Sequence, residues 1–180
     1  IKYNSSGTQQ WAARYNGPGN DLDEARSLAV DGSGNVYVTG NSYGSSSGLD
    51  YATIKYNSSG AQQWVTRYNG PGNSQDVANA MVIDGSGNVY VTGYSTVSGT
   101  NNDYSTLKYN SSGVQQWVTR YNGPGNSIDH ANSIAVDISG NVYVTGYSTV
   151  SITNLDYAKI KYHDDALPVE IAYFNSSVNE

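Results

Sequence analysis

Carboxylate side chains recur at one point of the sequence, each six residues after the first glycine of a Gly-Pro-Gly-Asn segment. They are Asp23, Asp76 and Asp129, and the asparagines of the same segments are Asn20, Asn73 and Asn126. Carboxylate and amide oxygens gathered in one place can hold a cation or bind the hydroxyl groups of a polyol. Alternatively, each aspartate accepts backbone N–H groups within its own loop. Repetition favours this second interpretation, because an active site is built once whereas a structural device is needed in every copy.

Other residues offer little catalytic chemistry. The chain has two histidines, His130 and His163, in unrelated contexts, and it has no cysteine. A catalytic triad, a zinc site and a thiolate site are therefore not expected. His130 takes the place of Val77 and Glu24 in the neighbouring copies, so we expect a tolerated surface substitution. The sequence predicts no catalytic residue, no metal site and no cofactor.

A second aspartate set opens the segment Asp-x-Ser-Gly-Asn, at Asp31, Asp84 and Asp137. A calcium-binding EF-hand loop needs an acidic residue at its twelfth position, where this chain has serine. We therefore expect side-chain-capped turns at these aspartates. We also expect Arg14, Arg67 and Arg120, which recur in the same way, to pair with aspartates of the same or an adjacent unit.

A tandem repeat determines the structural elements that position these residues. The three tryptophans, Trp11, Trp64 and Trp117, are separated by 53 residues each, and residues 54–106 and 107–159 are identical at 40 of 53 positions. The units are assigned to residues 1–53, 54–106 and 107–159, with the start of a fourth unit up to residue 165. Such a period is typical of solenoids, propellers and arrays.

Each unit reads as four strands. In the middle copy these are residues 78–84, 88–96, 103–110 and 115–122, rich in Val, Thr and Tyr and joined by Gly- and Asn-containing turns. A repeated four-stranded antiparallel meander is a β-propeller blade, so we predict an all-β chain of propeller blades. In this arrangement the loops of Asp23, Asp76 and Asp129 enter the innermost strands at one end of the central axis.

Side-chain size alternates along the first strand of each unit, which predicts that the strand has two different faces. Small residues, such as Ala78 and Ala80, are expected on one face, and large residues, such as Met81 and Ile83, on the other. The tryptophans are expected to pack between adjacent blades rather than to serve as a stacking platform for sugars.

Composition excludes several classes of function. The chain is 37% hydrophobic and 13% charged, which suffices for a packed core, and its net charge is −6. Because nucleic acids and anionic membranes require clustered basic residues, no nucleic-acid partner is expected. No apolar run is long enough for a membrane span.

The repeated phrases resemble a known family. Asp-x-Ser-Gly-Asn-Val-Tyr-Val-Thr-Gly at residues 31–40, 84–93 and 137–146, followed by Asp-Tyr-Ala-Thr-Ile-Lys-Tyr-Asn at 50–57 and Trp-x-x-Arg-Tyr-Asn-Gly-Pro-Gly-Asn, is similar to the SBBP repeat of bacterial β-propellers. The resemblance covers residues 1 to about 162 and implies a secreted or surface protein with no assigned catalytic residue. Residues 166–174, ALPVEIAYF, resemble a segment near the sorting region of proteins exported by the type IX system. Alternatively, residues 166–180 form a linker or a closing strand.

The sequence therefore predicts a non-enzymatic extracellular or cell-surface scaffold or binding module with a glycan or protein ligand. Alternatives are the propeller of a carbohydrate-active enzyme and a subunit of a repetitive surface filament. Propellers close with about 4–8 blades, so three units require further repeats or self-association through blade edges. The start inside a third strand indicates a piece of a longer chain.

Overall fold

The computed structural model describes residues 1–98, 101–151, 154–163 and 168–174. These ranges form strands and no helix, and therefore contain no helix able to cross a membrane. The strands are β1 (Lys2–Tyr3), β2 (Gln9–Trp11), β3 (Asp23–Val30), β4 (Val36–Tyr43), β5 (Leu49–Tyr56), β6 (Gln62–Tyr68), β7 (Asp76–Ile83), β8 (Val89–Ser98), β9 (Asn101–Tyr109), β10 (Gln115–Tyr121), β11 (Asp129–Val136), β12 (Val142–Ser151), β13 (Asn154–Tyr162) and β14 (Pro168–Phe174).

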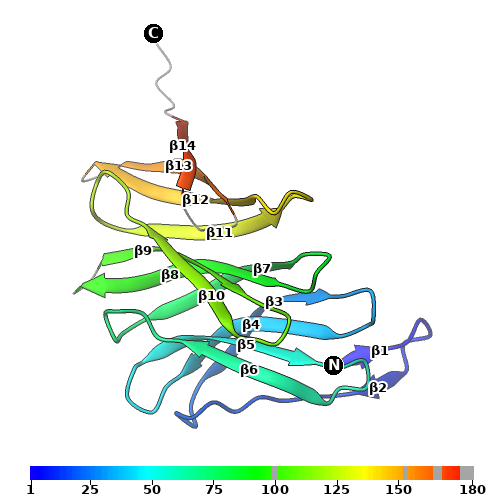
Figure 1. The fold of residues 1–180 in the computed structure, drawn as a ribbon. Helices are drawn as coiled ribbons and strands as arrows, with labels where there is room; N and C mark the ends of the chain where they lie inside the picture. The colour runs from blue at the N-terminus through cyan, green and yellow to red at the C-terminus, as the bar shows by residue number, and fades with distance from the viewer. Residues whose placement is uncertain (99–100, 152–153, 164–167, 175–180) are drawn as a thin grey trace.

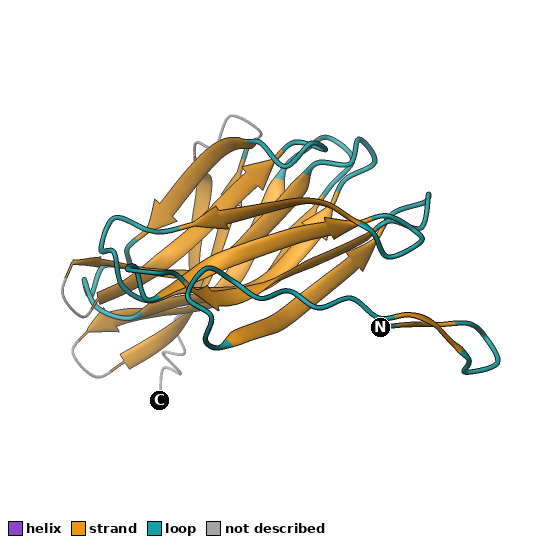
Figure 2. Ribbon diagram, turned by 90° about the horizontal axis from the view of Figure 1, so that it is seen from below, coloured by secondary structure: helices purple, strands orange, loops and turns teal. Residues whose placement is uncertain are grey.

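The strands make three four-stranded antiparallel sheets, in the orders β3-β4-β5-β6, β7-β8-β9-β10 and β11-β12-β13-β14. We call them the first, second and third sheets. They follow one another along the chain and are stacked in that order (Figure 1). The predicted all-β architecture of four-stranded meanders is confirmed. Strands β1 and β2 pair with each other as a hairpin outside the three sheets (Figure 2), and Trp11 of this hairpin contacts the first sheet.

The hairpin turns form as their sequence predicts. Asp84 accepts the N–H groups of Ser86 and Asn88 on Oδ1, at 2.9 Å each, and its backbone C=O accepts the Gly87 N–H. Asn110 does the same at the next turn, with Ser112 and Val114 at 3.0 Å. These side chains replace the backbone partners that the turn residues lose, which fixes the ends of the flanking strands.

A β-bulge in the first strand of every sheet changes the predicted faces. Ala78 pairs with Gly93 whereas Ala80 pairs with Thr92, so Asn79 is an extra residue. Since Gly93 and Thr92 are consecutive in β8, Ala78 and Ala80 lie on opposite faces. The prediction is therefore wrong for Ala78, which lies on the face of Met81 and Ile83, because it assumed uninterrupted alternation. Ala80 lies on the opposite face from Met81 and Ile83, as predicted.

The bulge also requires the glycine that faces it. A Cβ atom on Gly93 would lie 1.9 Å from the Val77 carbonyl oxygen, and Gly40 and Gly146 are placed in the same way. A side chain cannot be accommodated at that distance, which explains the glycine of the repeated Val-Thr-Gly phrase.

Each sheet has a tyrosine face and an aliphatic face, and the tyrosine face of one sheet packs on the aliphatic face of the next. At the first interface, Tyr37, Tyr51 and Tyr68 of the first sheet cover Ala78, Met81, Val89, Val91 and Leu107 of the second. The second interface repeats this with Tyr90, Tyr104 and Tyr121 against Ala131, Val142, Val144, Ala158 and Ile160. The hydrophobic core therefore lies between the sheets.

Trp64 and Trp117 pack between adjacent sheets, as predicted, whereas Trp11 packs between the β1–β2 hairpin and the first sheet. Trp64 lies edge-on to the Tyr37 ring of its own sheet, at 6.0 Å, and its indole N–H donates to the Ser111 carbonyl of the next sheet at 3.1 Å. Trp11 makes the equivalent bond to the Ser58 carbonyl at 3.1 Å, and Trp117 packs at the second interface.

The C-terminal segment supplies the last strand of the third sheet. β14 pairs with β13 in the position that β6 and β10 occupy in the other sheets. Of the two predictions for residues 166–180, the closing strand describes residues 168–174, while residues 166–167 and 175–180 lie outside the described ranges. The repeat boundaries at residues 54 and 107 fall inside β5 and β9, whereas the sheets begin at Asp23, Asp76 and Asp129.

Candidate functional site

The Gly-Pro-Gly-Asn loops are closed by their own polar groups. In the middle loop, Asp76 Oδ2 accepts the Gly70 N–H at 2.6 Å and Asn69 donates its amide to Asn73 Oδ1 at 2.7 Å. Asn73 has φ of 45°, a left-handed conformation that asparagine tolerates. The other two loops repeat this: Asp23 with Gly17 at 2.9 Å, Asp129 with Gly123 at 2.7 Å, and Asn20 and Asn126 with φ of 49° and 47°.

The predicted site residues therefore close their own loops. Asp76 and Asp129 have no exposed surface, and burial raises the pKa of Asp76. Each aspartate begins the first strand of its own sheet, while Asn20, Asn73 and Asn126 are exposed in the loops. In the described part of the chain, no three His, Asp or Glu side chains are grouped closely enough to hold a metal ion. The structure thus does not bring the three aspartates into one cluster.

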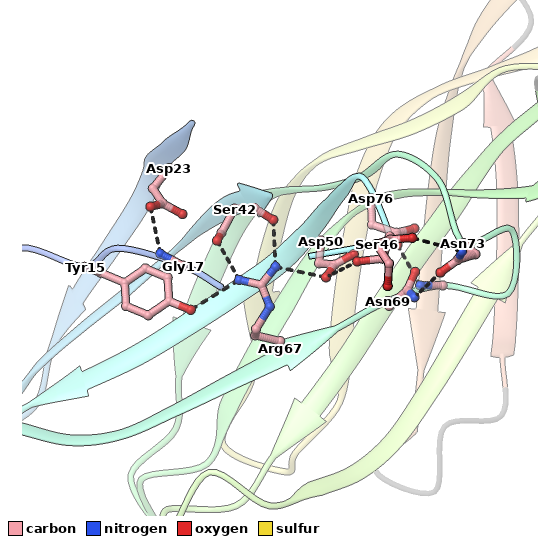
Figure 3. A network of polar contacts seen from close by, with 12 residues as sticks. Tyr15, Gly17, Asp23, Ser42, Ser46, Asp50, Arg67, Asn69, Asn73 and Asp76 are labelled. Carbon is pink, nitrogen blue, oxygen red and sulfur yellow. Dashed lines mark hydrogen bonds and ion pairs between the residues drawn. The ribbon is translucent and has the colours of Figure 1, made fainter. Parts of the chain in front are cut away.

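A row of polar side chains extends from each loop across the sheet. In the first sheet, Asp23, Ser42 and Asp50 are cross-strand partners. Arg67 then binds the row through Ser42 Oγ at 2.5 Å, the Ser42 carbonyl at 2.8 Å and Asp50 Oδ2 at 2.9 Å (Figure 3). Its guanidinium also donates to the Tyr15 hydroxyl at 3.2 Å. This bonding matches the predicted pairing of arginine with aspartate.

The equivalent row of the second sheet is less complete. Arg120 hydrogen-bonds the Tyr68 hydroxyl, and the described residues show no ion pair between Arg120 and Asp103. Asp103 is 6% exposed, and its Oδ1 has no hydrogen-bond partner in the described ranges. Burial, reinforced by the charge of Asp129, raises the pKa of Asp103 to about 6. Two positions with the same sequence context therefore differ in their electrostatics.

The residues that differ between repeats meet on the inner strands. The ring of His130 (β11) stacks on that of Tyr94 (β8), with centroids 3.8 Å apart and planes 8° apart. Its Nδ1 lies 2.6 Å from the Tyr147 hydroxyl and its Nε2 lies 3.2 Å from the Asn102 amide nitrogen. We call Tyr94, Asn102, His130 and Tyr147 the inner cluster.

His130 is not the surface substitution that the sequence predicts. Burial lowers its pKa to about 4, so the imidazole is neutral at neutral pH. With the Asn102 amide nitrogen donating to Nε2, the imidazole proton is on Nδ1 and is donated to the Tyr147 oxygen. The prediction failed because the neighbours of His130 come from three other strands.

The first sheet carries a charged counterpart of the inner cluster, formed by Glu24, Arg26 and Asn41. Arg26 and Glu24 form an ion pair at 2.9 Å, and Asn41 donates to Glu24 at 3.2 Å. The hydrogen bonds from Asn41 and Arg26 lower the pKa of Glu24. Asn41 is 3% exposed and its Oδ1 has no partner in the described ranges. Burial raises the pKa of the Tyr94 hydroxyl, and the charges of Arg26 and Glu24 act on this pKa in opposite directions.

One signal in the sequence could have found the inner cluster. Positions 24, 77 and 130 carry Glu, Val and His, and positions 41, 94 and 147 carry Asn, Tyr and Tyr, inside segments that are otherwise nearly identical. Variation among near-copies marks positions that the repeated fold does not dictate. Tyr94, Asn102 and Tyr147 were missed because, apart from the two histidines, only repeated residues were considered as candidates.

Two solved structures are similar to this chain over part of their own length. The crystal structure of a eukaryotic initiation factor superposes with a TM-score of 0.58 and 9% identity, over 94% of this chain and 36% of that one. An α-L-arabinofuranosidase from Clostridium thermocellum ATCC 27405 superposes with a TM-score of 0.49 and 15% identity, over 88% of this chain and 57% of that one. This chain thus spans about a third and just over half of their lengths, and the first likeness shows the fold alone. No curated protein matches the sequence.

The family comparison covers all three copies. The β-propeller repeat described as SBBP matches residues 10–46, 63–99 and 116–152, which together exceed half of the chain. Each matched segment begins next to a tryptophan and runs through the Gly-Pro-Gly-Asn loop and the first two strands of a sheet. The protein belongs to the SBBP β-propeller repeat family.

Proposed function

We propose that this chain is a non-enzymatic scaffold and binding module of an exported bacterial protein, located outside the cell or on its surface. One observation carries the proposal: the repeated carboxylates close loops and turns of the fold, whereas the residues that vary between repeats gather on the inner strands. Asp23, Asp76 and Asp129 bind their own loops, and Asp31, Asp84 and Asp137 bind their own turns.

The inner cluster and its charged counterpart favour a glycan as ligand. One face of the half-buried Tyr94 ring is stacked on His130, so the C–H face of a sugar would pack on the other face. Glu24 and Arg26 are exposed charged partners for hydroxyl groups. A protein loop is the alternative ligand. Nucleic acid is disfavoured by the net charge of −6.

The location of the protein is inferred from its sequence. The lack of cysteine, the acidic composition and the likeness of residues 166–174 to a type IX export segment all suit an exported protein. Export is tested by fractionating the native host and detecting the protein in the medium or on the cell surface. Detection in the cytoplasm alone would refute this location.

Binding is tested with a glycan panel and calorimetric titration of the positives. We expect Tyr94→Ala to abolish glycan binding, because the stacking surface is lost. Tyr3→Ala is the matched control, since Tyr3 is an exposed tyrosine on the β1–β2 hairpin, away from the inner cluster. A melting curve of each variant separates lost binding from lost folding. Failure of every glycan to bind, or equal binding by a folded Tyr94→Ala variant, would refute the glycan site.

A further inference from the structure

An asparagine stands directly before the first glycine of every Gly-Pro-Gly-Asn loop. The segment Arg-Tyr-Asn-Gly-Pro-Gly-Asn is identical at residues 14–20, 67–73 and 120–126. An Asn-Gly peptide bond is chemically labile, because glycine has no side chain to hinder attack of its backbone nitrogen on the asparagine amide. The loops therefore carry the same labile bond at three asparagines, Asn16, Asn69 and Asn122.

The reaction at such a bond is deamidation, which replaces the side-chain amide with a carboxylate. In the middle loop, the Gly70 nitrogen would lose its proton to water and attack Asn69 Cγ. A bond between that nitrogen and Cγ forms while the bond between Cγ and Nδ2 breaks, and the amide nitrogen takes up a proton and leaves as ammonia. Water then opens the resulting succinimide ring to aspartate or to isoaspartate.

The fold requires the glycine that makes this bond labile. Gly70 is buried, and a Cβ atom added to it would lie 2.0 Å from Ser95 Oγ and 2.6 Å from Asp76 Oδ1. In the third loop, a Cβ atom on Gly123 would meet the equivalent serine and aspartate oxygens at 1.9 and 2.6 Å. A side chain at these distances would displace both oxygens, which explains why glycine follows the asparagine in each loop.

Hydrogen bonds within the loop hold both groups that would react. Asp76 Oδ2 accepts the Gly70 N–H at 2.6 Å, and Asn69 donates its side-chain amide to Asn73 Oδ1 at 2.7 Å (Figure 3). The corresponding two bonds measure 2.7 and 2.5 Å in the third loop and 2.9 and 2.8 Å in the first. Because the nitrogen and the amide are held by different partners, they can meet only when the loop opens.

We propose that Asn16, Asn69 and Asn122 are latent deamidation sites, which the closed loops keep unreactive. The asparagines themselves are exposed, so water reaches them as soon as the loop opens. The rate of deamidation then follows the frequency of opening. The protecting residues are the aspartate and the second asparagine of each loop, namely Asp23, Asp76, Asp129, Asn20, Asn73 and Asn126.

Deamidation also prevents the loop from closing again. The new carboxylate at position 69 has no hydrogen to donate to Asn73 Oδ1, and the two oxygens repel each other. Isoaspartate in addition lengthens the backbone before Gly70 and shifts its N–H away from Asp76. Each loop that reacts therefore stays open and gains a negative charge, so that a transient opening becomes a permanent change.

The middle and third loops allow a comparison within one molecule, because residues 67–74 and 120–127 have the same sequence. Asp76→Ala removes the acceptor of the Gly70 N–H from the middle loop alone. Since this bond to a carboxylate helps to keep the loop closed, we expect deamidation at Asn69 to become about tenfold faster. The rate at Asn122 should stay that of the wild type.

Mass spectrometry measures both rates in one sample of the full chain, incubated in mildly alkaline buffer. Trypsin cleaves after Arg67 and Arg120, so the two loops lie on different peptides, and fragmentation locates the changed residue. The wild-type chain unfolded in urea gives the unprotected rate, which should be the same at Asn69 and Asn122. A melting curve of each variant shows that it is folded during the incubation.

Asn73→Gly is a second variant that leaves Asp76 in place. It removes the acceptor of the Asn69 amide, and glycine readily adopts the φ of 45° found at this position. We expect faster deamidation at Asn69 here too. The proposal would be overturned if the folded wild type deamidates at Asn69 as fast as the unfolded chain. No change of the Asn69 rate in either variant, or an equal rise at Asn69 and Asn122 in both, would also overturn it.

Discussion

Asp103→Asn should stabilise the protein, and only at neutral to alkaline pH. Asp103 is buried, its Oδ1 lacks a hydrogen-bond partner in the described ranges, and its pKa is raised to about 6 by burial and by Asp129, from 3.8 for a solvated aspartate. An amide of the same shape carries no charge to bury. The substitution therefore removes the cost of ionising this group in the folded state.

The sign and size follow from the two pKa values. Because the folded chain holds this proton more tightly than the unfolded chain does, the stability that Asp103 contributes is complete below about pH 4 and is lost as pH rises through about 6. The difference between the folded and unfolded pKa values of Asp103 corresponds to about 3 kcal/mol of stability, which solvent screening reduces to about 1–3 kcal/mol. Asp103→Asn should thus raise the free energy of unfolding by about 1–3 kcal/mol at about pH 8 and change it little at about pH 4.

Urea unfolding of both proteins at a series of pH values is the measurement. His130 titrates with the opposite effect, because burial lowers its pKa to about 4 and stability is lost as pH falls below its unfolded pKa. The difference between variant and wild type at each pH cancels this contribution.

Asp50→Asn is the matched control, since Asp50 holds the same position in the first sheet but is paired with Arg67 at 2.9 Å. We expect it to destabilise the protein by about 1–3 kcal/mol at about pH 8. If the two substitutions change stability in the same direction, or if the effect of Asp103→Asn does not depend on pH, the assignment of a raised pKa to Asp103 is refuted.

Two further substitutions test the contacts between sheets, each by urea unfolding against a control at an equivalent position. Gly113→Ala should lower the free energy of unfolding by about 1–2 kcal/mol more than Gly7→Ala does. Both glycines have positive φ, but only at Gly113 would the new Cβ lie 2.7 Å from the Trp64 ring. Equal losses of stability would exclude this contact. Arg67→Met should destabilise the protein by about 2–4 kcal/mol, because it leaves the buried Asp50 carboxylate unpaired. Arg14→Met should change the stability little, since the described residues show no ion pair for Arg14. A large effect of Arg14→Met would contradict this reasoning.

Local interactions made much of the fold predictable. The turns at Asp84 and Asn110 are fixed by their own side chains, within four residues, so the four strands of each unit could be placed from the sequence. The fixed spacing of the tryptophans then required equivalent places between sheets, which the structure confirms for Trp64 and Trp117. Closure of the Gly-Pro-Gly-Asn loop by Asp76 is local in the same sense, and it was one of the two interpretations considered.

Features that depend on several strands were not predictable in this way. The bulge at Asn79 moves Ala78 to the opposite face of the first strand from Ala80, because an extra residue is defined only by the register of the partner strand. His130 owes its neutral state to burial among Tyr94, Asn102 and Tyr147, none of which is its neighbour in sequence. The sequence by itself determined the repeat, its strands and its turns, since these rest on contacts inside one unit. Only the tertiary structure decided which faces meet, which carboxylates are buried or paired with arginine, and where the non-repeated residues gather, because burial and charge at each residue depend on groups from other sheets.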